Sequence, residues 1–184
     1  MNVLSLFDGM SCGRIALERA GIKVTRYFAS EVDKNAVKVS NHNYPSIEHI
    51  GDVTKVKYTD GILSWGNGSE AVKIDLVIGG SPCQDFSIAR VMGNNGGIAS
   101  GLEGDKSSLF FEYLRILRSI QEHNTDVKFL LENVKMKSTS KAELDNFLGV
   151  AGVYIDSELL SFQKRSRYYW SNIEFDVPQN KEIS

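Results

Sequence analysis

Residues 74–80 read IDLVIGG. The first five residues are apolar except for Asp75, and two glycines end the segment. A strand with apolar side chains on both faces belongs in a sheet that is covered on both sides, which is the usual setting of parallel strands. Outward from this run in both directions, short apolar segments alternate with amphipathic helical ones. The alternation predicts an α/β fold, with a mostly parallel sheet and helices on both of its faces.

Element boundaries follow from periodicity and from end signals. We expect strands at residues 3–7, 24–30, 74–78 and 127–131, and a closing antiparallel pair at 153–160 and 168–172. We expect helices at residues 12–20 (with Gly21 as the stop), from Asp33 as a cap to about 43, at 109–120 and at 141–148. Residues 90–107 hold five glycines and predict a mobile loop with a functional role.

The bulk composition is that of one globular domain. The chain has 184 residues, of which 42% are hydrophobic and 24% charged. It has no apolar run of the ~20 residues that a membrane span needs, and its first residues lack the features of a secretory signal. Cys12 and Cys83 lie in unrelated contexts, which indicates free thiols in a reducing compartment, and they are too few for a structural zinc site. We therefore expect a cytoplasmic protein without a membrane segment or a metal site.

Charge is distributed unevenly. The net charge is −2, which offers no general attraction to nucleic acid. Basic residues gather in QKRSR, residues 163–167, and at Lys135, Lys137 and Lys141. This pattern indicates a local basic site rather than a surface that follows a whole duplex.

The first candidate site is LFDGMSCG, residues 6–13, where a strand ends and a helix begins within a few residues. Gly9 and Gly13 allow close approach of a ligand, and the free N–H groups at the start of the helix suit a carboxylate. Glu31, at the end of the second strand, is placed to accept hydrogen bonds from ribose hydroxyls, and Asp52 can accept one from an adenine amino group. Taken singly, these residues equally fit an ordinary strand–helix turn, a surface glutamate and a turn aspartate.

The segment IGGSPCQDFS, residues 78–87, places Cys83 just after a buried strand, at the edge where open α/β sheets bind ligands. Its polar and glycine-rich surroundings favour a reactive thiol over a packed one.

Two later segments carry charged groups. FLLENV, residues 129–134, ends a buried strand in Glu132, and we expect that carboxyl to have little water around it, so that its protonated form can persist near neutral pH. In QKRSR, Arg165 and Arg167 would share one face of a strand and grip a phosphate or a base carbonyl. A charged edge strand gives the same pattern.

Together these segments resemble the motifs of the cytosine-5 DNA methyltransferase family. LFDGMSCG resembles its first motif, PCQ its nucleophile motif, ENV its glutamate motif and QKRSR its paired-arginine motif, in the family order and with similar spacing. LFFEYLRIL, residues 109–117, looks like the family helix before ENV. The resemblance covers nearly the whole chain and implies a Rossmann-like, S-adenosylmethionine-dependent methyltransferase fold.

The resemblance also implies a role for each matched residue. The implied cofactor-binding residues are Phe7, Asp8, Gly9, Gly13, Glu31, Val32, Asp52, Val53, Pro82 and Leu109. The implied catalytic residues are Cys83, Glu132, Arg165 and Arg167. In this scheme a methyl group passes from S-adenosylmethionine to C5 of a cytosine flipped out of double-stranded DNA, through a covalent adduct at Cys83.

The sequence departs from the family pattern after the paired arginines. There the family has a target-recognition region and two further motifs, whereas this sequence stops at Ser184. We therefore expect residues 1–184 to be a catalytic domain that needs a downstream segment or a separate polypeptide for efficient cofactor binding and turnover.

Two other functions remain open. The same catalytic groups serve methylation of transfer RNA, and a non-catalytic regulatory role is disfavoured because the chain keeps both PC and ENV. An amino-methyltransferase is disfavoured because no DPPY-type or NPPY-type tetrapeptide follows IDLVI.

Overall fold

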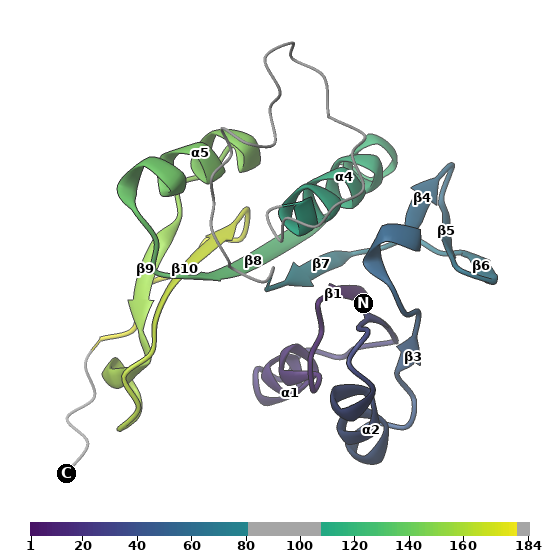
Figure 1. Ribbon diagram of the computed structural model, residues 1–184, viewed down its shortest axis with the longest axis horizontal. Helices are drawn as coiled ribbons and strands as arrows, with labels where there is room; N and C mark the ends of the chain where they lie inside the picture. Colours follow the sequence, from purple (N-terminus) through teal and green to yellow (C-terminus); the bar gives the residue numbers. More distant parts are fainter. Residues whose placement is uncertain (81–107, 180–184) are drawn as a thin grey trace.

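A computed structural model describes residues 1–80 and 108–179. Its centre is a seven-stranded sheet in the order β3-β2-β1-β7-β8-β10-β9 (Figure 1). The strands are β1 (Asn2–Leu6), β2 (Arg26–Ser30), β3 (Glu48–His49), β7 (Leu76–Gly79), β8 (Lys128–Val134), β9 (Val153–Asp156) and β10 (Ser166–Ser171). Strands β3, β2, β1, β7 and β8 are parallel, and β10 runs antiparallel to both of its neighbours. The predicted mostly parallel sheet is confirmed.

Helices cover both faces of this sheet. Figure 1 shows α4 (Ser108–His123) and α5 (Ser138–Leu148) on one face, with α1 (Cys12–Arg19) and α2 (Lys34–Asn43) on the other. Alternate residues of β1 supply two cores: Leu4 joins the larger one, which includes α4, and Val3 joins the smaller one, against which Leu17 of α1 packs. In β7, Val77 and Ile78 divide between the same two cores. This two-sided burial explains the unbroken apolar run in IDLVI.

The predicted helix ends are confirmed where a specific end residue was named. The Asp33 carboxylate accepts hydrogen bonds from the backbone N–H groups of Asn35 (2.8 Å) and Ala36 (3.4 Å), which would otherwise lack partners at the start of α2. Gly21 has a φ of +70° directly after α1, a left-handed conformation that glycine adopts without strain.

A second, three-stranded antiparallel sheet was not predicted. It consists of β4 (Lys57–Thr59), β5 (Ile62–Trp65) and β6 (Gly68–Ala71). Arg26 of β2 ties it to the main sheet, because its guanidinium pairs with Glu48 of β3 and, at 2.6 Å, with Glu70 of β6.

The closing hairpin differs from its predicted bounds. β9 and β10 pair antiparallel as expected, but β9 ends at Asp156. There the Asp156 carboxylate accepts the Glu158 N–H and caps a short 3-10 helix, η2 (Ser157–Leu159), so the predicted continuation of the strand to residue 160 is wrong.

The strand order creates a topological switch point. From β1 the chain builds outward to β2 and β3 on one side, and it later adds β7 and β8 on the other side. The carboxyl ends of β1 and β7 therefore flank the position at which open α/β sheets bind ligands. The predicted loop at residues 90–107 lies outside the described residues.

Candidate functional site

The sheet brings most of the predicted site residues to one edge. Asp8 follows β1, Glu31 follows β2, and a 3-10 turn, η1 (Val53–Lys55), begins after Asp52, beyond β3. On the other side of the switch point, Glu132 lies near the end of β8 and Arg167 lies in β10. Asp8, Glu31 and Glu132 lie at the carboxyl ends of parallel strands, as the sequence predicts, and Arg167 reaches the same edge at the start of antiparallel β10.

The turn after β1 holds Asp8 in a nearly buried position, with 9% of its surface exposed. One carboxylate oxygen accepts the Tyr27 hydroxyl (2.7 Å), and the other accepts the Ser11 hydroxyl (2.5 Å). Burial of Tyr27 and the neighbouring charge of Asp8 raise the pKa of the phenol. Asp8 is therefore committed first to shaping its own turn.

The two glycines of this turn serve different purposes. Gly9 has a φ of +60°, and among the described residues no atom lies within 4 Å of where a Cβ would project, so a ligand can approach it. A Cβ on Gly13 would lie 2.4 Å from Cδ1 of Ile78 and 3.1 Å from the Tyr27 hydroxyl. On its Cβ side, Gly13 therefore approaches the sheet closely, and its predicted contact with a ligand stays a prediction.

Glu31 links the ends of β1 and β2. Its Oε2 accepts the Gly9 N–H (2.8 Å), while its Oε1 accepts the N–H groups of Val32 and Asp33 (both 2.8 Å). A carboxylate offers about four acceptor positions, so roughly one, on Oε2, remains for a ligand. Glu31 is therefore more than a surface glutamate.

The remaining predicted cofactor residues are unevenly accessible. Val32 is 69% exposed, whereas Val53 is 5% exposed and its side chain belongs to the larger core. Asp52 accepts the Thr54 N–H (3.0 Å) and so caps η1. Phe7 and Leu109 are partly buried against the larger core.

Glu132 has a cationic partner. Its Oε1 forms an ion pair with Nε of Arg167, without the alignment of a hydrogen bond, and Nη1 of Arg167 donates to the Ser166 carbonyl (2.9 Å). The Glu132 side chain is 33% exposed. The expected dry surroundings are wrong, because this carboxyl lies near the strand end, where the sheet meets solvent, and beside a guanidinium.

Arg165 lies one residue before β10 and is exposed. Its backbone N–H donates to Asp156 (2.9 Å), and within the described part of the chain its guanidinium forms no hydrogen bond or ion pair. Arg165 and Arg167 both oppose the rise in the pKa of Tyr169 that burial and, secondly, Glu132 produce. Arg167 and Tyr169 are two residues apart in β10 and so share a face, and Arg165 continues the same alternation one residue before the strand.

Tyr169 was not singled out from the sequence. It lies directly opposite Glu132 in the β8–β10 register and is half-buried. The signal was present, because Tyr169 continues the every-second-residue pattern that Arg165 and Arg167 begin.

Pro82 and Cys83 lie outside the described residues, but the chain that leads to them starts inside. β7 ends at Gly79, between β1 and β8. A Cβ on Gly80 would lie 3.0 Å from Oε2 of Glu132. The segment that carries Cys83 therefore leaves the sheet beside the Glu132–Arg167 pair.

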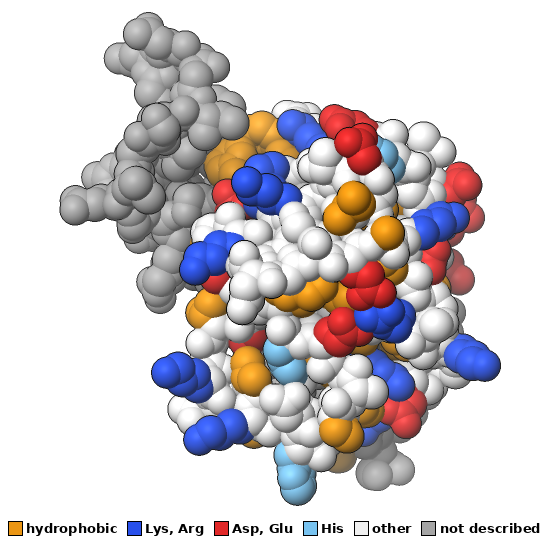
Figure 2. All heavy atoms as spheres, turned by 90° about the vertical axis from the view of Figure 1, so that its right-hand side faces the viewer, with side chains coloured by type: hydrophobic (Ala, Val, Ile, Leu, Met, Phe, Trp, Pro, Cys, Tyr) orange, Lys and Arg blue, Asp and Glu red, His pale blue; other side chains and the backbone are white. Residues whose placement is uncertain are grey.

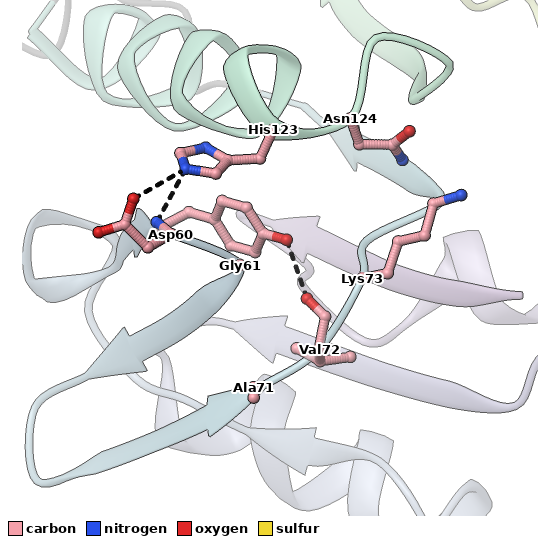
Figure 3. A pocket seen from close by; sticks show the side chains of 8 residues that line it. Asp60, Gly61, Ala71, Val72, Lys73, His123 and Asn124 are labelled. Atoms are coloured by element: carbon pink, nitrogen blue, oxygen red, sulfur yellow. Dashed lines mark hydrogen bonds and ion pairs between the residues drawn. The ribbon is translucent and has the colours of Figure 1, made fainter.

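A separate hollow of about 390 Å³ lies at the opposite edge of the sheet, between the small sheet and the end of α4 (Figure 3). In it the Asp60 N–H donates to His123 (3.0 Å), and none of the predicted site residues lines it. On the face that Figure 2 shows, acidic and basic side chains are interspersed. Neither feature adds to the candidate site.

Within residues 1–80 and 108–179, no helix is long and apolar enough to cross a bilayer. The same residues include no cluster of three or more His, Cys, Asp or Glu side chains arranged to hold a metal ion.

The chain matches the family model for C-5 cytosine-specific DNA methylase over residues 1–150. It belongs to this family. The orphan methyltransferase M.SPRI of Bacillus phage SPR is 32% identical over 197 aligned residues, which cover 100% of this chain and 40% of that protein. The DNA (cytosine-5)-methyltransferase DRM2 of Arabidopsis thaliana is 38% identical over 133 residues, covering 66% of this chain and 19% of that protein.

The fold of this cytosine-5 methylase chain has a solved counterpart. The crystal structure of S. pombe Dnmt2 methyltransferase gives a TM-score of 0.70 at 20% identity, over 96% of this chain and 52% of that one. The predicted family and Rossmann-like methyltransferase fold are therefore confirmed. This chain spans 40% or less of the length of its two phage relatives, M.SPRI and M.Rho11sI of Bacillus phage rho11s.

Proposed function

We propose that this chain is the catalytic part of a DNA (cytosine-5) methyltransferase, with S-adenosylmethionine as methyl donor and Cys83 as nucleophile. Family membership supports the reaction class. The observation that supports the assignment of Cys83 is that its segment follows Gly80, where an added Cβ would lie 3.0 Å from Oε2 of Glu132. A nucleophile that leaves the sheet there would meet a base held by Glu132.

The described residues fit the proposed cofactor. Open space faces Gly9, one acceptor position remains on Glu31 for a ribose hydroxyl, and Val32 offers an exposed apolar side chain to an adenine ring. Asp52 keeps a carboxylate oxygen for the adenine amino group. Phe7, Asp8, Leu109 and Pro82 would line the methionine end, while Gly13 seats α1 and Val53 can offer only its backbone. Bound there, S-adenosylmethionine would supply the electrophilic methyl group that C5 of cytosine receives.

The chemistry on the base follows from the remaining groups. The target cytosine leaves the stack, because its ring carbons are unreachable inside a duplex. The Cys83 thiolate adds to C6, and the electron pair of the C5–C6 double bond makes C5 nucleophilic. Arg167 holds Oε1 of Glu132, which leaves Oε2 to accept from the cytosine amino group, and the same carboxyl can share a proton with N3. Arg165 would donate to the base carbonyl. After C5 has accepted the methyl group, a base from the solvent would take the C5 proton, the C–H electron pair would re-form the C5–C6 double bond, and the S–C6 bond would break to return the Cys83 thiolate.

Target recognition and part of the cofactor wall would come from a further polypeptide segment, in the same chain or a separate one. The short coverage of the phage relatives supports this. A DNA substrate and free thiols fit the cytoplasm of a bacterial or phage-infected cell.

A covalent trap tests the nucleophile. Duplex DNA containing 5-fluorocytosine retains the adduct, because the C5 substituent cannot leave as a proton. We expect the adduct to map to Cys83, to persist in the matched control Cys12→Ser, whose thiol is exposed, and to vanish in Cys83→Ser. The assay is run on residues 1–184 with and without an added target-recognition segment from a relative.

An adduct on Cys12, or methylation by Cys83→Ser at the parent's rate, would overturn the assignment. Methylation of transfer RNA but not of duplex DNA in a parallel assay would show that the substrate is transfer RNA. It would leave the assignment of Cys83 as nucleophile unchanged.

A further inference from the structure

The turn between β1 and α1 is conformationally strained. Three of its five residues have a positive φ: Phe7 (58°), Gly9 (60°) and Ser11 (63°). Glycine adopts this conformation freely, but Phe and Ser do so at an energetic cost that surrounding contacts must offset. The contacts that hold Phe7 and Ser11 in place therefore determine the shape of the proposed cofactor turn.

A buried chain of hydrogen bonds supplies the contacts at Asp8 and Ser11. The Ser11 hydroxyl has a single proton, which it donates to Asp8 (2.5 Å), so in its 2.6 Å contact with Ser40 it accepts. The Ser40 proton is thereby used, so Ser40 accepts in turn from Nε2 of His49 (3.2 Å). Tyr27 donates to the other oxygen of Asp8 (2.7 Å). All the protons point toward one carboxylate.

This assignment fixes the state of His49. With its proton on Nε2, Nδ1 is the bare nitrogen, and Nδ1 is buried with no partner among the described residues. The chain requires a proton on Nε2, and burial lowers the pKa of His49, which favours the neutral ring over the imidazolium.

The Tyr27 and Ser40 hydroxyls lie in the protein interior, not at the carboxyl ends of the strands. Tyr27 (β2) is 3% exposed and Ser40 (α2) is fully buried. Neither hydroxyl can touch a ligand at the carboxyl ends of the strands, so each acts on that site only through the turn.

We propose that Tyr27 and Ser40 are positioning residues that hold the strained 7–11 turn in its ligand-binding shape through Asp8 and Ser11. This inference rests on the proposed role of the turn in binding S-adenosylmethionine. It makes cofactor affinity depend on two hydroxyls that never contact the cofactor.

The test uses Tyr27→Phe and Ser40→Ala, each of which removes one oxygen. Tyr44→Phe is the matched control, because the Tyr44 hydroxyl also donates to a carboxylate, that of Glu18 (2.9 Å), but on the exposed surface of α1 and α2. Each ¹⁵N-labelled protein is titrated with S-adenosylhomocysteine up to millimolar concentration, at a temperature where every variant is folded. Amide hydrogen exchange is measured on the same samples.

We expect Tyr27→Phe to weaken binding at least tenfold and Ser40→Ala several-fold, with Tyr44→Phe within twofold of the parent. Exchange at Gly9 and Ser11 should accelerate in the first two variants, while the amides of β7 and β8 stay unchanged. A purely global loss of stability would instead accelerate exchange throughout the sheet. If Tyr27→Phe does not fold, Ser40→Ala carries the test.

Parent-like affinity and parent-like exchange at Gly9 in the folded variants would overturn the inference alone. Absence of any saturable shift in the parent, both alone and with an added segment that completes the cofactor wall, would overturn the proposed cofactor role, and the inference with it.

Discussion

At the edge formed by the carboxyl ends of the parallel strands, the charged groups of the two halves have different kinds of partner. On the half formed by β1 and β2, the carboxylates of Asp8 and Glu31 are occupied by N–H and O–H donors of the protein itself. On the half formed by β8 and β10, Glu132 meets the guanidinium of Arg167, and Arg165 has no charged partner among the described residues.

The difference indicates two separate tasks. The first half fixes the shape of the backbone, and the second half presents charged groups that a ligand could contact. Neutral donors around Asp8 and Glu31 fix a backbone, and a fixed backbone presents its remaining groups without reorganisation. Charged groups near the surface at Glu132 and Arg165 can exchange partners with an incoming polar ring. Under the proposed function, the first half would be organised before the ligand binds, and the second half would be completed by binding.

The largest expected effect lies on the second half. Glu132→Gln should reduce kcat/KM for methyl transfer by about 100-fold or more, because a proton-transferring carboxyl of this kind contributes roughly 10²–10⁴-fold. Cofactor affinity should stay within twofold, since Glu132 lies across the switch point from Glu31. Steady-state kinetics with the matched exposed control Glu158→Gln checks this. A variant that loses cofactor affinity instead would show that the two halves are coupled.

On the first half, Glu31→Ala should lower both cofactor affinity and the free energy of unfolding. Three backbone N–H groups lose their acceptor, and a loss on the order of 1–3 kcal/mol is expected for partly buried groups of this kind, toward the lower end here. Calorimetry and urea unfolding measure the two quantities, with exposed Glu18→Ala as control. Unchanged affinity together with reduced stability would leave Glu31 a purely structural role.

The smallest expected effect is the loss of stability of the β9–β10 hairpin at low pH. The Ser166 hydroxyl, with the N–H groups of Glu158 and Arg165, lowers the pKa of Asp156 to about 2. Because the folded pKa lies below the unfolded value of about 3.9, Asp156 stabilises the hairpin above that value, and the contribution disappears as pH falls from about 4 through about 2. Amide exchange in β9 and β10 should accelerate over this window in the parent, whereas Asp156→Asn should be destabilised already at neutral pH and respond less. The same dependence of amide exchange on pH in the parent and in Asp156→Asn would show that Asp156 does not stabilise the hairpin in this way.

Much of the main sheet was predictable because its signals are local. IDLVI, the Asp33 cap and the Gly21 stop each depend on a few neighbouring residues. The small sheet was missed because its strands are short and mixed in polarity, although Asp60-Gly61 is a hairpin signal. Both residues have a positive φ, as a two-residue type I′ turn requires.

The site was predictable in its position but not in its contacts. The ends of apolar runs indicate where Glu31 and Glu132 lie along the edge. They do not indicate that Arg167 meets Glu132, because that depends on the register of β10 against β8. The donors to the 7–11 turn were also unpredictable, since Tyr27 and Ser40 reach it only through tertiary packing.

The reversed direction of β10 has a consequence for how such an edge can change. At the carboxyl ends of the sheet, each parallel strand is continued by the residues that follow it in the sequence. An antiparallel strand delivers the residues that come before it, and so Arg165 arrives there ahead of β10, from a hairpin loop rather than from a crossover helix. A hairpin loop can lengthen, shorten or exchange residues without rerouting any strand of the interior. The groups nearest the proposed base can thus vary independently of the scaffold that carries the proposed cofactor turn.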